Sequence, residues 1–244
     1  MKKYLPIILF VVGAIVLAVV FYFIAKSTKE TGSFEDETEV VPEVALNLRP
    51  VASLIPTDDG HWLNLTVEKF EIEAKTMDYE LLYSLPDGRT QGVPGSVSLS
   101  SGDIVERKLL LGSESSGKFR YDEGVEEGTL TLKFRNSSGK LVAKFQTKWH
   151  LQSGDTELSS VDGKFSYTLA KAPVKTWFVT METFGVPKEV PAEVVAGPYG
   201  VFSSSKTKIP GEVSLGTKVY RYSTNWTEIT DNTSPDLGIF VSTN

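Results

Sequence analysis

The sequence predicts an all-β protein that follows an N-terminal transmembrane helix. Three observations support this prediction: an uncharged apolar run near the N-terminus, period-2 alternation of apolar and polar residues after about Leu46, and turn clusters between the alternating segments. Many short strands at this spacing, without an amphipathic helix, indicate an antiparallel β-sandwich. An immunoglobulin-like or fibronectin-like architecture is expected by analogy only, because the chain has no Cys–Trp–Cys framework.

The apolar run covers Tyr4–Ala25, twenty-two residues without a charge. At about 1.5 Å per residue, a helix of this length crosses the roughly 30 Å hydrocarbon core of a bilayer. A cleaved signal peptide fits less well, because its apolar core is about 7–15 residues long and small residues precede its cleavage site, whereas this run ends in bulky aromatics. We therefore expect an uncleaved single-pass anchor. Lysines flank both ends, and a cytoplasmic N-terminus with an extracytoplasmic C-terminal part is the simpler arrangement.

Four segments are expected along the chain. Residues 1–25 form the transmembrane anchor, and residues 26–45 form a disordered acidic linker that its like charges keep extended. A β-sandwich domain follows at residues 46–152 and a second β-rich domain at residues 153–244, with a break near Gln152–Thr156. A single continuous β domain is the alternative, because the second stretch is short for a sandwich of roughly 100 residues.

The clearest β element is a hairpin over Gly128–Leu151, whose two arms alternate on either side of the turn Asn136–Gly139. A strand over Trp62–Ala74 changes parity at Glu68-Lys69, which indicates a β-bulge or a bend that carries the chain from one sheet to another. Prolines 187, 191 and 198 favour edge strands and ordered loops around them. Further strands are expected at Tyr79–Leu85, Gly95–Leu99, Arg107–Leu111, Lys118–Tyr121, Lys164–Leu169, Thr176–Glu182, Glu193–Phe202, Glu212–Tyr222 and Leu237–Ser242.

Composition and charge exclude several classes of function. The chain has a formal net charge of −6, and because residues 1–29 carry four lysines and no acids, residues 30–244 carry −10. A chain this acidic argues against a nucleic-acid partner, which requires clustered Lys and Arg. There is no cysteine, so an exported domain must rely on its packed core rather than on disulfides, and this is more typical of a bacterial envelope protein.

One segment nearly matches a nucleotide-binding P-loop. Gly112–Phe119 has the G-x-x-x-x-G-K spacing after an apolar strand, but Phe119 replaces the Ser or Thr that holds Mg²⁺. The following residues read as a strand and a turn, whereas phosphate binding requires a helix N-terminus. We therefore expect a polar hairpin loop here and no cofactor.

The sequence offers no strong catalytic or metal-binding constellation. His61 follows Asp58-Asp59-Gly60, which is more typical of a turn between strands than of a metal site, and His150 is expected to be solvated. No G-x-S-x-G elbow is present. The acids Glu123, Glu126 and Glu127 are expected to form a solvated turn. We predict no catalytic residue and no metal ligand.

Aromatic residues give the best candidate for a partner patch. Tyr220 and Tyr222 share a strand face near Trp226, and such a group can bind a ligand or partner, although a core or lid position is the alternative. Trp149 is in phase with the apolar face of its strand and is expected in the core. A basic stripe is expected on an exposed sheet face, where it keeps that face soluble: Lys133, Arg135, Lys144 and Lys148.

These observations predict a non-catalytic, membrane-anchored extracytoplasmic β protein of a bacterial cell envelope. It would act as a binding or structural module, with the membrane contacted through Tyr4–Ala25 and with a protein or glycan as partner. Two alternatives remain. One is an envelope glycan hydrolase with paired carboxylates, and the other is an accessory subunit of a membrane assembly.

Overall fold

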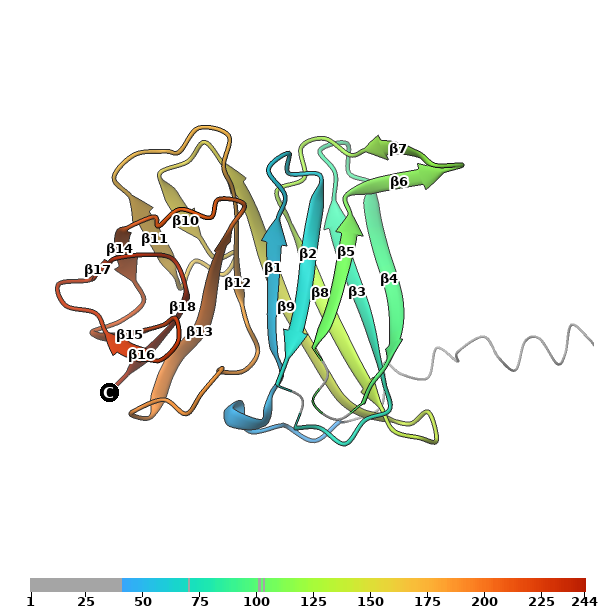
Figure 1. Cartoon of the computed structure of the whole chain (residues 1–244), viewed down its shortest axis with the longest axis horizontal. Coiled ribbons are helices and arrows are strands. Elements are labelled where there is room, and N and C mark those ends of the chain that lie inside the picture. Colours follow the sequence, from blue (N-terminus) through green and yellow to red (C-terminus); the bar gives the residue numbers. More distant parts are fainter. Residues whose placement is uncertain (1–40, 70, 101, 103) are drawn as a thin grey trace, which may run out of the picture. The chain divides into compact units, whose positions relative to one another are not determined.

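The computed structural model describes residues 41–69, 71–100, 102 and 104–244. The predicted anchor at Tyr4–Ala25 and most of the predicted linker lie outside this range, so both stay predictions. Among the described residues, no helix is long and apolar enough to cross a membrane. The only helical element described is a short 3-10 turn at Leu46–Leu48, and every strand pairing is antiparallel, as the sequence predicts (Figure 1).

A nine-stranded sheet is the largest sheet of the described residues. Its strand order is β16-β15-β18-β13-β12-β9-β8-β3-β4, so strands from both halves of the described chain share it. The strands are β3 (Thr76–Ser84), β4 (Thr90–Ser98), β8 (Glu127–Arg135), β9 (Leu141–Ser153), β12 (Trp177–Glu182), β13 (Val194–Ser203), β15 (Lys218–Tyr222), β16 (Trp226–Glu228) and β18 (Ile239–Thr243).

A three-stranded sheet covers one end of the large sheet and forms what we call the first lobe. It contains β1 (Val51–Pro56), β2 (Trp62–Glu68) and β5 (Val105–Leu110) in the order β1-β2-β5, and it lies across β3, β8 and β9 in Figure 1. Apolar residues of the two sheets face each other in one core, as alternation along each strand requires. Its fully buried members include Leu54, Leu63, Leu65, Leu81, Leu132, Trp149, Val179 and Met181.

A four-stranded sheet covers the other end and forms the second lobe. It contains β10 (Glu157–Ser159), β11 (Ser166–Leu169), β14 (Gly211–Ser214) and β17 (Thr233–Ser234). Phe178 of β12 belongs to the core of this lobe, whereas its neighbour Val179 belongs to the core of the first lobe. Because successive strand residues point to opposite faces, the two small sheets cover opposite faces of the large one. The strand β12 is therefore buried on both faces.

Most predicted strands are present with shifted ends. The hairpin over Gly128–Leu151 is confirmed as β8 and β9, and Asn136 Oδ1 accepts hydrogen bonds from Ser138 N at 3.0 Å and Lys140 N at 3.1 Å in its turn. Lys118–Tyr121 is a strand with the predicted bounds. Trp149 is fully buried, as predicted.

Two of the predicted strands are interrupted where the chain passes from one sheet to another. Trp62–Ala74 is a strand only as far as Glu68, and the bend that the change of parity at Glu68-Lys69 predicts is confirmed, because Lys69 adopts a left-handed φ of 60° and the chain turns toward the large sheet. Phe70 lies outside the described residues. The strand expected over Glu212–Tyr222 is two strands, β14 in the four-stranded sheet and β15 in the nine-stranded sheet.

The position of Pro198 also differs from expectation. It lies in β13, which is an interior strand between β18 and β12 rather than an edge strand. The register of β13 against β18 shifts between Ala196 and Tyr199, so the proline falls at an irregularity of the ladder, where its missing N–H costs no regular hydrogen bond.

The described chain forms one compact unit, Val41–Asn244. The domain boundary expected between residues 152 and 153 falls at the last two residues of β9, and the large sheet continues across it into β12. Two separate cores nevertheless exist, one in each lobe. The division into one domain at residues 46–152 and a second at residues 153–244 stays a prediction.

Candidate functional site

The segment that resembles a P-loop is a β-hairpin that stands apart from the other sheets. It comprises β6 (Gly112–Ser115) and β7 (Lys118–Tyr121), joined by Ser116 and Gly117 with φ values of 51° and 75°. Two consecutive positive φ values are typical of the type I′ turn of a tight hairpin. No helix follows, so the segment lacks the phosphate-binding geometry, and the predicted hairpin is confirmed.

Exposed aromatic rings line one side of this hairpin. Phe119 and Tyr121 alternate along β7 and so share a face, and they are 45% and 37% exposed. Their rings are nearly parallel, at 8° with centroids 6.4 Å apart. Tyr121 stacks on His61 with centroids 4.1 Å apart, and Phe119 meets Trp62 edge to face at 5.4 Å. We call these four residues the aromatic strip.

Hydrogen bonds hold the hairpin against the first lobe. Leu111 N donates to His61 O at 2.9 Å, and Asp122 N donates to Leu111 O at 3.0 Å, which places the hairpin beside the β1–β2 turn. Tyr83 Oη donates to Asp122 Oδ2 at 2.9 Å. Burial and the adjoining Asp122 carboxylate raise the pKa of Tyr83, so its hydroxyl stays protonated and keeps donating.

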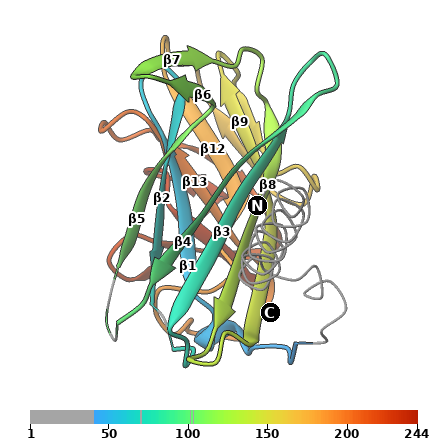
Figure 2. The ribbon, with the colours of Figure 1, turned by 90° about the vertical axis from the view of Figure 1, so that its right-hand side faces the viewer.

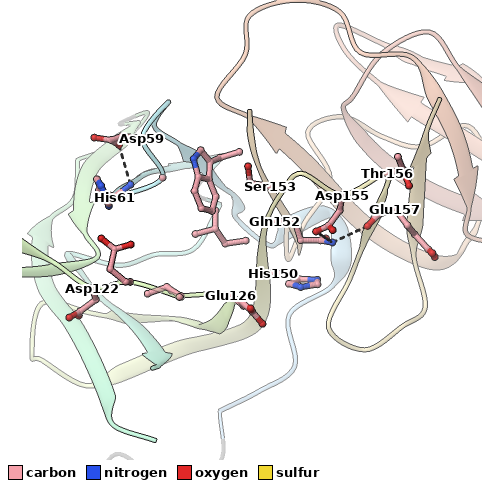
Figure 3. Close-up of a pocket in the computed structure, with 16 residues that line it drawn as sticks. Asp59, His61, Asp122, Glu126, His150, Gln152, Ser153, Asp155, Thr156 and Glu157 are labelled. Carbon is pink, nitrogen blue, oxygen red and sulfur yellow. Dashed lines mark hydrogen bonds between the residues drawn. The ribbon is translucent and has the colours of Figure 1, made fainter. Parts of the chain in front are cut away.

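A cavity of about 640 Å³ adjoins the strip (Figure 3). Its walls come from the β1–β2 turn, from the segment that leads into β8, and from the end of β9 with the following turn. Both histidines line it, together with Trp177. The lining contains six acids and neither Lys nor Arg; the acids are Asp59, Asp122, Glu123, Glu126, Asp155 and Glu157.

The β1–β2 turn fixes one wall of the cavity. Asp59 Oδ1 accepts a hydrogen bond from Thr57 Oγ1 and another from His61 N at 3.1 Å, and the Thr57 hydrogen bond is the main cause that lowers the pKa of Asp59. Gly60 has a φ of 72° and packs on the Trp177 indole, where a Cβ would lie 2.7 Å from Cδ2. Asp58-Asp59-Gly60 is thus a turn, as predicted.

The opposite wall contains His150, and here the sequence prediction is wrong. His150 was expected to be solvated, yet it is half-buried, and its Nδ1 lies 2.9 Å from Ser159 O. Because a carbonyl oxygen only accepts, Nδ1 carries the proton of this hydrogen bond. Gln152 reinforces the wall by donating to Glu157 O and accepting from Ser159 N, both at 2.9 Å. The C-terminal end of the β9 face that reads as polar is therefore covered by β10, whereas Lys144, Gln146 and Lys148 on the same face are exposed.

The three residues predicted as a partner patch lie elsewhere, on β15 and β16. Tyr222 and Trp226 are half-buried with ring centroids 5.2 Å apart, and Trp226 Nε1 donates to Lys188 O at 2.9 Å. Tyr220 is only 8% exposed and belongs to a small apolar cluster with Val241. This patch stays a prediction.

The remaining candidates are placed as follows. Glu123 and Glu126 are exposed, as predicted for a solvated turn, but both line the cavity, whereas Glu127 begins β8. In the basic stripe, Arg135 Nε donates to Asp78 Oδ2 at 2.8 Å, so an acid of the neighbouring strand neutralises part of it. Within the described ranges, no group of three or more His, Asp or Glu is arranged to hold a metal ion.

Comparisons with protein-family models, with curated proteins and with solved structures found no match to this chain. The site is therefore interpreted from its geometry. The aromatic strip was missed at the level of sequence, although Phe119 and Tyr121 are visibly in phase in the strand predicted at Lys118–Tyr121.

Proposed function

We propose that this protein is a non-catalytic, membrane-anchored binding module, and that the aromatic strip with its adjoining cavity is the binding surface. The observation that carries the proposal is the exposure of Phe119 and Tyr121 on a hairpin that stands clear of the other sheets (Figure 2). Exposed aromatic rings beside a hollow release ordered water when a partner covers them, and they contribute much of the energy at interfaces.

The remaining parts of the proposal come from the sequence. The helix at Tyr4–Ala25 anchors the chain, its N-terminus is cytoplasmic, and the acidic linker at residues 26–45 holds the β unit off an extracytoplasmic membrane face. The setting is a bacterial cell envelope and the partner is a protein or a glycan. The sheet-on-sheet packing supports an immunoglobulin-like or fibronectin-like sandwich by analogy of architecture.

A glycan hydrolase is the second candidate, because carboxylates lie on more than one wall of the cavity. A general acid needs a raised pKa, however, and the pKa of Asp59 is lowered. Replacing Glu123 and Glu126 by Gln would leave any release of reducing sugar from envelope glycan unchanged if the module is non-catalytic. A loss of such release would establish the hydrolase instead.

Affinity capture from native membranes tests the binding function. The full-length chain, the double variant Phe119→Ala/Tyr121→Ala and the variant Tyr222→Ala are compared as baits after cross-linking. We expect the double variant to lose the captured partners and Tyr222→Ala to retain them. If Tyr222→Ala loses them and the double variant does not, the binding surface lies at the patch on β15 and β16.

A further inference from the structure

We propose that the occupant of the aromatic strip and its cavity is a basic, extended segment of a partner protein, with arginine side chains as its main contacts. This inference rests on the proposed binding function and adds the chemistry of the partner. It is built from the charges of the cavity, the faces of the rings and the spacing along β7.

No Lys or Arg of the described residues forms an ion pair with a carboxylate of the cavity. The ion pairs of the described residues involve other acids, namely Glu43, Asp78, Asp87, Asp162 and Asp236. Six acids therefore share one hollow without a Lys or Arg in its lining. Like charges in a concave surface repel each other and concentrate a negative potential, which an incoming cation relieves.

The aromatic strip contributes the second set of contacts, between its rings and the cations of the partner. A cation can lie over an aromatic face, and Lys108 Nζ already does so above Trp62 at 4.5 Å from the ring centroid. Phe119 and Tyr121 offer two more rings with exposed surface. A guanidinium suits this pairing better than an ammonium, because it stacks flat on a ring and also binds a carboxylate with two parallel hydrogen bonds.

The geometry favours an extended peptide over other polymers. Side chains on one face of an extended segment recur at about 6.6–6.8 Å, and the centroids of Phe119 and Tyr121 are 6.4 Å apart. His61 joins the two parts of the surface, since it stacks on Tyr121 and also lines the cavity. A segment with Arg at alternate positions can thus contact the rings and the carboxylates together. A nucleic acid would be repelled, and a neutral glycan would leave the carboxylates uncompensated.

Peptide binding tests this inference. The full-length chain in nanodiscs of zwitterionic lipid is titrated against a fluorescent decapeptide of alternating Arg and Ser, with anisotropy as the readout. The matched probe replaces every Arg by citrulline, which keeps the shape and removes the charge. We expect the citrulline peptide to bind at least about tenfold more weakly, and salt to weaken the Arg peptide because it screens the attraction.

Matched variants locate the binding. Glu123→Gln/Glu126→Gln/Glu157→Gln removes three charges from the cavity and should weaken the Arg peptide about tenfold or more. The control carries the same change of net charge on exposed acids outside the cavity, Glu106→Gln/Glu193→Gln/Glu212→Gln, and should change binding less than twofold. Phe119→Ala should weaken the Arg peptide about fivefold.

Equal binding of the two peptides, or equal losses in the two triple variants, would overturn the inference. Tighter binding of a neutral chitotetraose probe than of the Arg peptide would do the same and would identify a glycan instead. The proposed function fails separately, when capture from native membranes does not depend on Phe119 and Tyr121.

Discussion

The shared strand β12 predicts that the two lobes unfold together. Leu65 in the first core and Leu158 in the second are both 0% exposed, so Leu65→Ala and Leu158→Ala form a matched pair. Truncation of a fully buried Leu costs about 3–5 kcal/mol, the lost transfer free energy plus the cavity left behind. For a unit of roughly 200 residues, about 3 kcal/mol lowers Tm by about 6–12 °C.

The cooperativity follows from the position of β12. Phe178 packs in the second core and Val179 in the first, so unfolding of either lobe exposes one face of β12 to water. Each substitution should therefore shift one common transition by a similar amount, although the two sites lie in different cores.

Differential scanning calorimetry of the full-length chain in detergent measures this. We expect a single transition in the wild type and in both variants, with the calorimetric and van't Hoff enthalpies equal. Two transitions, of which Leu65→Ala moves one and Leu158→Ala the other, would refute the reasoning and establish two independent domains at residues 46–152 and 153–244.

Three further outcomes are expected. Burial raises the pKa of Glu182, so its carboxyl loses the proton at higher pH in the folded than in the unfolded chain, and stability falls as pH rises between these two pKa values. Glu182→Gln should therefore raise the urea midpoint at pH 7 and leave it unchanged at pH 3. Equal gains at both pH values would contradict this cause. Gly60→Val should cost about 2 kcal/mol and shift the Trp177 fluorescence, because Gly60 has a left-handed φ and touches the indole; a neutral result would disprove that packing. Partial burial opposes ionisation of Asp162, but hydrogen bonds from Ser160 and Tyr199 outweigh it and lower its pKa. The stability from this carboxylate is therefore present above its pKa in the unfolded chain and is lost as pH falls through its pKa in the folded chain. Tyr199→Phe should cost about 1 kcal/mol at pH 7 and less at pH 2, and a cost that does not depend on pH would contradict the account.

Alternation in the sequence predicted those strands whose apolar residues share one buried face. The hairpin of β8 and β9 is the best example, because Leu130, Leu132 and Phe134 are all buried and lie one residue apart from polar neighbours. In β12 the residues from Phe178 to Met181 are all buried, so their pattern indicates a strand but not the sheets that cover it.

Choice of sheet could not be predicted locally. The change of parity at Glu68-Lys69 indicates a bend within Trp62–Ala74, but Glu212–Tyr222 reads as one strand, since the residues on both sides of its crossing have strand-like patterns. Only the tertiary pairing shows that β14 joins β11 while β15 joins β18. The prediction for His150 is wrong because of a tertiary contact, since β10 covers the end of a β9 face that alternation assigns to solvent.

The binding surface was only partly visible in the sequence. The phase of Phe119 and Tyr121 follows from their strand, whereas their contacts with His61 and Trp62 depend on the hairpin docking beside the β1–β2 turn. The cavity gathers acids from segments that are distant in sequence, and no local pattern reports that they share one hollow.

Site-specific photo-crosslinking in native membranes tests the central claim most directly. A photoreactive amino acid replaces Phe119 in the full-length chain, and in the control it replaces Val195, which is 55% exposed. Val195 lies near the start of β13, whereas the cavity wall is near the other end of this strand, where Ser204 N donates to Trp177 O. We predict adducts with a polypeptide at position 119, absent at position 195, whose attachment point maps to an Arg-containing segment. Adducts of equal yield at both positions, or adducts with glycan alone at position 119, would contradict the account.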